Sequence, residues 1–271
     1  MPATPTRGED APLDLTGRMP DVDERFGEGV LDETLWWPYY TPHWSTRERS
    51  AARYTVERDG LELRIDADTP AWAPESDGGI RCSHLQTGQW SGPAGSTTGQ
   101  HRFRPGLVVR EAQPERRLLL PHFGVIEVRM AAVRHPDAMV AFWPIGFEED
   151  PDDCGEICVA EIFGSELDDQ GGWVGVGVKP QNDPRLRLDV EKVRVDGDLT
   201  DFHDYAVEWT PDRLRFFIDH RWVKTVDQRI DYPVQLMLDV FELPRDDGTR
   251  DLAALPHRFR VERVRVFPPV G

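Results

Sequence analysis

Residues 155–163 read Gly-Glu-Ile-Cys-Val-Ala-Glu-Ile-Phe, an apolar run that carries two glutamates. The apolar residues predict a strand, and a buried strand has no need of these carboxylates. Side chains two apart in a strand share a face, so Glu156 and Cys158 point to one side and Glu161 to the other. A one-residue bulge near residues 159–160 would return Glu161 to the face of Glu156, because bulges re-aim side chains beside active sites. We therefore expect a bulged strand with both glutamates on one surface.

Two neighbouring carboxylates have a chemical use. In a water-poor cleft they push each other's pKa values apart, which supplies one ionised group and one proton donor near neutral pH. Glycoside hydrolysis requires such a pair. An exposed edge strand in an acidic chain is the alternative explanation of the same spacing.

The composition and charge of the chain indicate which classes of partner it can bind. The chain has 271 residues, with 49 acidic and 32 basic side chains and a net charge of −17. This charge is spread along the chain, which argues against nucleic acid or an anionic membrane and favours a neutral or cationic ligand such as a polysaccharide. We expect a disordered lead-in at residues 1–18 and a single domain at residues 19–271, acting as a monomer.

The cysteines and the N-terminal residues indicate in which cellular compartment the protein is expected. Cys82, Cys154 and Cys158 are few and odd in number, so we expect free thiols, and no metal-ligand spacing recurs. The N-terminus lacks the apolar core of a secretory signal, and no stretch approaches a membrane span. The sequence as given predicts a cytoplasmic protein, or a secreted one if a leader has been lost.

Alternating and apolar segments predict an all-β protein. No segment of useful length has helical periodicity, and residues 67–106 are rich in Gly, Pro, Ser and Thr, which predicts long loops that wall a cleft. We expect a jelly-roll β-sandwich of two antiparallel sheets with a concave substrate cleft. The expected strands are residues 54–57, 61–66, 123–130, 139–146, 172–179, 202–209, 213–219, 235–241 and 258–267.

The run at residues 155–163 resembles the catalytic signature of glycoside hydrolase family 16, the laminarinase and lichenase family. That signature is Glu, an apolar residue, Asp, one or two apolar residues, and Glu. Further segments resemble the family in the same order: Gly-x-x-Glu-x-Arg at 124–129, Ala-Phe-Trp at 141–143, and Phe-His-x-Tyr-x-x-Glu-Trp-Thr-Pro-Asp at 202–212. The resemblance covers roughly residues 20 to 270.

The resemblance implies catalytic roles. Glu156 would be the nucleophile and Glu161 the acid/base, while Cys158 stands where the family has its aspartate. A thiol has a usual pKa of about 8.5, and two flanking carboxylates raise it. Cys158 is therefore expected to stay a neutral, weak donor.

The resemblance also implies a set of sugar-binding residues. Trp143, Trp173 and Phe241 would stack on sugar rings, and Arg110 and Asp239 would bind hydroxyls. Lys179 is a further candidate, with a solvated lysine at a strand end as the alternative. The candidates for substrate binding are thus Arg110, Trp143, Trp173, Lys179, Asp239 and Phe241.

Together these features predict a retaining endo-glycosidase, either a hydrolase or a transglycosylase. The resemblance implies a β-glucan substrate with β-1,3 or mixed linkages. The alternative is a glycan-binding protein on the same fold that has lost turnover. We expect no cofactor and no metal in the site. A structural calcium ion at the convex face, held by backbone oxygens and one carboxylate near the chain ends, is left open beside the alternative of none.

Overall fold

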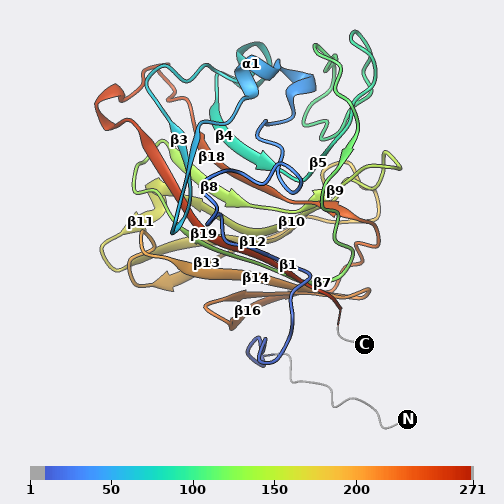
Figure 1. Cartoon of the computed structure of the whole chain (residues 1–271), viewed down its shortest axis with the longest axis vertical. Helices are drawn as coiled ribbons and strands as arrows, with labels where there is room; N and C mark the ends of the chain where they lie inside the picture. Colours follow the sequence, from blue (N-terminus) through green and yellow to red (C-terminus); the bar gives the residue numbers. More distant parts are fainter. Residues whose placement is uncertain (1–9, 270–271) are drawn as a thin grey trace.

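A computed structural model describes residues 10–269. It is an almost all-β structure in which two antiparallel sheets pack face to face (Figure 1), as the alternation predicts. Its helical segments are short: α1 Arg47–Ser50, α2 Pro74–Asp77, η1 Pro42–Trp44, η2 Gly164–Glu166 and η3 Leu252–Ala254. Among residues 10–269, no helix is both long and apolar enough to cross a bilayer.

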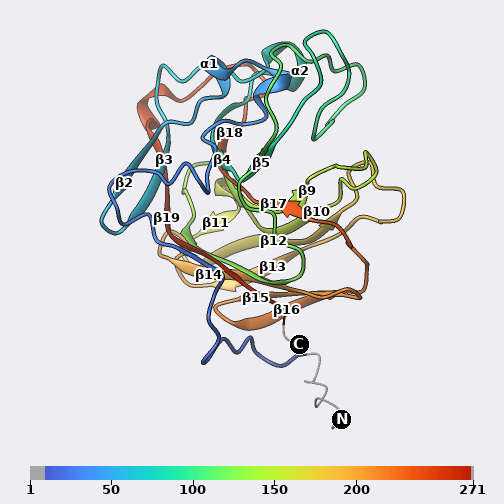
Figure 2. The ribbon, with the colours of Figure 1, turned by 45° about the vertical axis from the view of Figure 1, so that its right-hand side comes forward.

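The first sheet has eight strands in the order β16-β15-β14-β7-β19-β3-β2, with β1 paired to β19. Its outer strands β15 and β16 lie at the lower end of the molecule in Figure 2. The strand bounds are β1 Val22–Glu24, β2 Tyr54–Glu57, β3 Gly60–Ile65, β7 Gly124–Ala131, β14 His203–Trp209, β15 Leu214–Ile218, β16 Arg221–Val226 and β19 His257–Phe267.

The second sheet has nine strands. Its main path is β11-β12-β10-β8-β18-β4, while β13 pairs with β12, and β9 pairs with β10 and β17. A small separate ladder joins β5 Gly88–Gln89 to β6 Arg116–Arg117. The bounds are β4 Arg81–Gln86, β8 Ala138–Phe142, β9 Ile145–Gly146, β10 Glu156–Phe163, β11 Leu167–Asp168, β12 Gly171–Lys179, β13 Asp189–Asp196, β17 Val234–Gln235 and β18 Met237–Glu242.

The main core lies between the two sheets. On β12, Val174, Val176 and Val178 are fully buried in this core. Because side chains alternate along a strand, Gly175 and Lys179 lie on the opposite face of the nine-stranded sheet. That face is therefore free to carry a site.

A second apolar cluster covers part of this other face. It is formed by side chains from β8, β18 and the loops above them, among them Tyr40, Trp44, Trp72, Trp143 and Phe241. The expected loop at residues 67–106 contains a strand, β4, whose six residues are all buried. The sequence of this strand, Arg-Cys-Ser-His-Leu-Gln, does not predict a strand, because it is mostly polar and because a strand buried on both faces shows no alternation.

The expected disordered lead-in is corrected in part. Residues 1–9 lie outside the described residues, but residues 10–18 pack on the eight-stranded sheet. The Leu13 side chain is buried against Val125, Phe217 and Phe267, and its amide donates to the His220 carbonyl at 2.9 Å. A single leucine in a polar segment is a weak sequence signal, although it fills an apolar hollow on the sheet.

Candidate active site

The bulge on β10 is present where the sequence predicts it. In the ladder with β12, Glu156 lies opposite Lys179 and Cys158 opposite Gly177, but Glu161 lies opposite Gly175. Three steps along β10 therefore match two along β12. This extra residue returns Glu161 to the face of Glu156 and Cys158, and all three side chains line one cavity.

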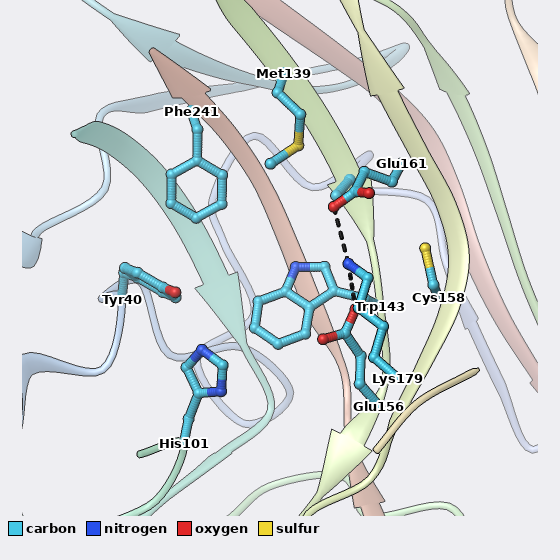
Figure 3. A pocket seen from close by; sticks show the side chains of 10 residues that line it. Tyr40, His101, Met139, Trp143, Glu156, Cys158, Glu161, Lys179 and Phe241 are labelled. Carbon is cyan, nitrogen blue, oxygen red and sulfur yellow. Dashed lines mark hydrogen bonds and ion pairs between the residues drawn. The ribbon is translucent and has the colours of Figure 1, made fainter. Parts of the chain in front are cut away.

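The cavity has a volume of about 140 Å³ and opens above β10, β12, β8 and β18 (Figure 3). Three predicted residues line it beside the β10 triad of Glu156, Cys158 and Glu161, namely Trp143, Lys179 and Phe241. These residues come from β10, β12 and β18 and from Trp143 directly after β8, which explains how a rigid sheet brings them together.

Lys179 joins the two glutamates. Its Nζ lies 3.0 Å from Glu156 Oε1 and 3.0 Å from Glu161 Oε1 (Figure 3). Burial alone would lower the pKa of Lys179, but the negative charges of Glu156 and Glu161 outweigh it and raise this pKa above its usual range. Lys179 therefore stays protonated as an ammonium. Its contacts with both glutamates distinguish it from the solvated lysine at a strand end that was the alternative.

Glu156 is the more deeply buried carboxylate, with 4% of its surface exposed. Besides Lys179, it accepts a hydrogen bond at Oε2 from Gln181 Nε2 at 2.6 Å. Burial raises the pKa of Glu156, and the Lys179 ammonium opposes this rise. The pKa of this carboxyl thus depends directly on the lysine.

Cys158 lies between the glutamates as a free, buried thiol. Its Sγ is 3.4 Å from the Gly175 carbonyl oxygen, to which the thiol donates. Burial raises the pKa of Cys158 well above its usual range, and the neighbouring carboxylates add to this effect. The thiol is therefore neutral near pH 7, as the sequence predicts.

Changing Cys158 to serine should alter activity by no more than about threefold, because a hydroxyl can donate to the same carbonyl. Steady-state kinetics of the variant checks this. Loss of activity as complete as that of a Glu156 variant would show that the thiol has a chemical role.

By contrast, Cys158→Asp places a carboxylate beside Glu156 and should move the acid limb of the pH–rate profile to higher pH. An unchanged profile would show that position 158 is not coupled to the glutamates.

Asp239 lies beneath the cavity and is fully buried. Its Oδ2 accepts hydrogen bonds from Trp143 Nε1 at 2.7 Å and from His84 Nδ1 at 3.0 Å. This placement corrects the expected contact with a sugar hydroxyl. Asp239 instead fixes the Trp143 indole that forms part of the cavity wall.

Trp173 and Arg110 lie outside the cavity. Trp173 is 43% exposed on β12, on the same face as Gly175 and Lys179, with the Arg194 guanidinium 5.9 Å from its ring. The expected stacking of Trp173 on a sugar ring stays a prediction. Arg110 instead pairs with Glu75 of α2 at 3.1 Å, and its expected binding of a sugar hydroxyl stays a prediction. The insertion before residue 120 makes the alignment of Arg110 with a sugar-binding arginine of the family loose.

Sequence reasoning missed four residues of the cavity. Met139, Ala141 and Trp143 are spaced two residues apart, so they lie on the same side of β8 and its end. The period of two in a strand could therefore have identified Met139 and Ala141. Tyr40 and His101 come from irregular segments that no local pattern places. Burial, followed by repulsion from His43, lowers the pKa of His101 to about 3, so it presents a neutral imidazole to the cavity.

One group of possible metal ligands lies on the eight-stranded sheet: Glu127, Asp204 and His220. Its carboxylates are already paired with arginines, Glu127 with Arg265 at 2.6 Å and Asp204 with Arg263 at 2.6 Å. Calcium prefers oxygen ligands without competing cations. This group also differs from the calcium site considered above, which would use backbone oxygens and one carboxylate, so that site stays a prediction.

Chemically, the cavity offers two carboxylates bridged by a cation, a neutral thiol, a neutral imidazole and aromatic walls. It places an oxygen nucleophile and a proton donor on one face, as acid/base-assisted displacement at an acetal carbon requires.

The sequence model of the glycosyl hydrolases family 16 matches residues 120–241. This span includes β7, β8, β10 and β12 and ends on β18, so it holds both glutamates and the strands paired with them. No curated protein sequence matches the chain.

Solved structures resemble the whole fold. A GlcNAcα1-4Gal releasing endo-β-galactosidase from Clostridium perfringens has a TM-score of 0.78 and 25% identity, covering 96% of this chain and 65% of that one. The present chain thus spans less than two thirds of that protein's length.

Two further structures are more distant. A laminarinase from Flavobacterium sp. UMI-01 has a TM-score of 0.63 and 18% identity, covering 92% of this chain and all of that one. The Crh5 transglycosylase has a TM-score of 0.59 and 17% identity over 91% of this chain and 83% of that one. Residues 120–241, which carry both glutamates, therefore match glycosyl hydrolases family 16, and the fold as a whole is similar to solved structures of glycan-cleaving enzymes.

Proposed function

We propose that the protein is a retaining endo-β-glycosidase with Glu156 as nucleophile and Glu161 as acid/base. The observation that carries this proposal is the shared ammonium. Because Glu156 Oε1 and Glu161 Oε1 each lie 3.0 Å from Lys179 Nζ, they cannot be further apart than twice that distance. Retaining enzymes place their carboxyls about 5–5.5 Å apart, and inverting enzymes about 6.5–9.5 Å apart.

The reaction proceeds in two balanced steps. First, the Glu156 carboxylate attacks the anomeric carbon, the glycosidic C–O bond breaks, and Glu161 gives its proton to the departing oxygen. Then the Glu161 carboxylate takes a proton from water or from a sugar hydroxyl, whose oxygen attacks the anomeric carbon and releases Glu156. Water gives hydrolysis, and a sugar hydroxyl gives transglycosylation.

Lys179 fits this cycle because the negative charge changes place. Before the first step the charge is on Glu156, and in the glycosyl-enzyme it is on Glu161. An ammonium 3.0 Å from both carboxylates can stabilise whichever is ionised without moving far. Lys179 is thus proposed as a positioning and charge-balancing residue.

The substrate is proposed to be a β-linked glycan chain. The laminarinase resemblance favours β-1,3 or mixed-linkage glucan. The structural likeness to the endo-β-galactosidase favours a second candidate, a chain with internal β-galactosides.

A panel of glycans tests both candidates: laminarin, mixed-linkage β-glucan and poly-N-acetyllactosamine. Mass spectrometry should show a ladder of oligosaccharides from one class, which is the signature of endo-cleavage. Proton NMR in the first minutes should show the β-anomer of the new reducing end. An α-anomer formed first would contradict retention, and no cleavage of any panel member would contradict the proposed substrates.

A further inference from the structure

A second cavity is lined by residues that neighbour those of the catalytic cavity along the chain. It has a volume of about 360 Å³ and is lined by residues 102–107 together with Thr97 and Asn182. In two chain segments, one residue lines or contacts the catalytic cavity and the next residue lines the second cavity. His101 lines the first cavity and Arg102 the second. Gln181 bonds to Glu156, and Asn182 lines the second cavity.

A hydrogen bond ties these two segments together. Asn182 Nδ2 donates to the Arg102 carbonyl oxygen at 3.0 Å. The loop at residues 97–107 and the segment after β12 both lie on the right-hand side of Figure 2. One glycan chain that occupies the catalytic cavity can therefore continue into the second cavity with a neighbouring sugar.

The charge of this second cavity is opposite to that of the protein. The chain has 49 acidic side chains, yet none lines this cavity, whereas two arginines do. Among residues 10–269, the Arg102 guanidinium forms no hydrogen bond or ion pair, although its charge acts to lower the pKa of the Glu148 carboxyl. Arg104 donates one hydrogen bond, to the Ser76 carbonyl at 2.8 Å, which leaves its other N–H groups available.

An apolar wall accompanies the two arginines. The Phe103 ring packs against Trp72 with a centroid distance of 5.4 Å, which fixes its position. A cavity that combines an aromatic wall with guanidinium groups suits a sugar ring that bears an anionic substituent. Guanidinium groups bind carboxylates and sulfates through paired N–H donors.

We propose that this cavity is a subsite for an acidic sugar, one that carries a carboxylate or a sulfate ester, within the β-linked glycan. The inference rests on the proposed function and adds the substrate's charge to it. The net charge of −17 disfavours a dense polyanion. The substrate is therefore a largely neutral chain with isolated anionic groups.

Binding to the Glu156→Gln protein tests the subsite without turnover. The probes are laminaritetraose and an N-acetyllactosamine tetrasaccharide, each in three forms: neutral, mono-6-carboxylate and mono-6-sulfate. Each charged form is a mixture of regioisomers, so that every ring position is sampled. Calorimetric titration should show at least tenfold tighter binding of one charged form than of its neutral parent. The carboxylate and sulfate arms identify which anion is recognised.

The matched control adds Arg102→Gln and Arg104→Gln to the same protein. This change should abolish the preference for the charged probe and leave binding of the neutral probe unchanged. In the background with Glu156 intact, it should also leave cleavage of neutral glycan unchanged. Added salt at 0.5 M should weaken only the charged probe.

The outcomes separate the subsite from the catalytic proposal. Cleavage of neutral glycan without any preference for charged probes overturns the subsite alone. A preference that survives the double arginine change overturns it as well. A preference without any cleavage supports the subsite and contradicts the proposed function. Absence of binding by all six probes overturns the subsite.

Discussion

Replacing Glu156 with glutamine should lower kcat by at least about 10⁴-fold, because the amide cannot form the glycosyl ester. The fold should persist, since the amide oxygen can still accept from Gln181, which now donates at 2.6 Å. Steady-state kinetics and a thermal melt together check this prediction. Activity within tenfold of the parent would show that Glu156 is not the nucleophile.

Glu161→Gln provides the matched comparison because it removes a proton donor and leaves the nucleophile. A general acid contributes about 10²- to 10⁴-fold, so natural glycans should lose that much activity. An aryl glycoside with a good leaving group needs no proton, so it should still form the glycosyl-enzyme in a burst. Added azide should then release a β-glycosyl azide. If Glu156→Gln shows the burst and Glu161→Gln does not, the two roles are reversed.

Lys179→Met should have the second large effect, a loss of about 10- to 100-fold in kcat/KM near neutral pH. The change removes a charged hydrogen-bond donor from both glutamates. It also removes the cation that opposes the burial-driven rise in the pKa of Glu156. Since Glu156 must be ionised to attack, a higher pKa means that activity is lost at a higher pH as the solution is acidified.

The pH dependence of kcat/KM measures this shift. The acid limb of the Lys179→Met profile should lie at higher pH than that of the parent. Lys179→Arg retains a cation and should keep the limb near its original place, which separates charge from packing. An acid limb that does not move in Lys179→Met would contradict the coupling, even if activity falls.

The sheet and its catalytic strand could be predicted because their signals are local. Alternation along residues 54–66 and 172–179 depends on near neighbours, and the glutamate spacing on β10 makes sense only with a bulge. The buried strand β4 was missed because its polar side chains pair with distant partners, as Arg81 does with Glu242. Hydrogen bonds across the fold leave no periodic trace in sequence.

The arrangement of the site could be predicted only in part, for a similar reason. The identity of Lys179 is visible in sequence, but its contact with both glutamates depends on the register between β10 and β12. Asp239 looked like a sugar ligand because strand position alone does not show depth below the cavity. His101 and the arginines at 102 and 104 lie in an irregular loop, where the chain path, and not periodicity, places each side chain.

Covalent capture examines the role of Glu156 most directly. The 2-deoxy-2-fluoro-β-glycosyl fluoride of the cleaved glycan slows release of the intermediate and lets it accumulate. Intact-mass analysis should show addition of one fluoroglycosyl group, and peptide mapping should place it on Glu156, with no addition to Glu156→Gln. An adduct on another residue, or turnover of the natural glycan by a protein that never forms an adduct, would contradict the mechanism.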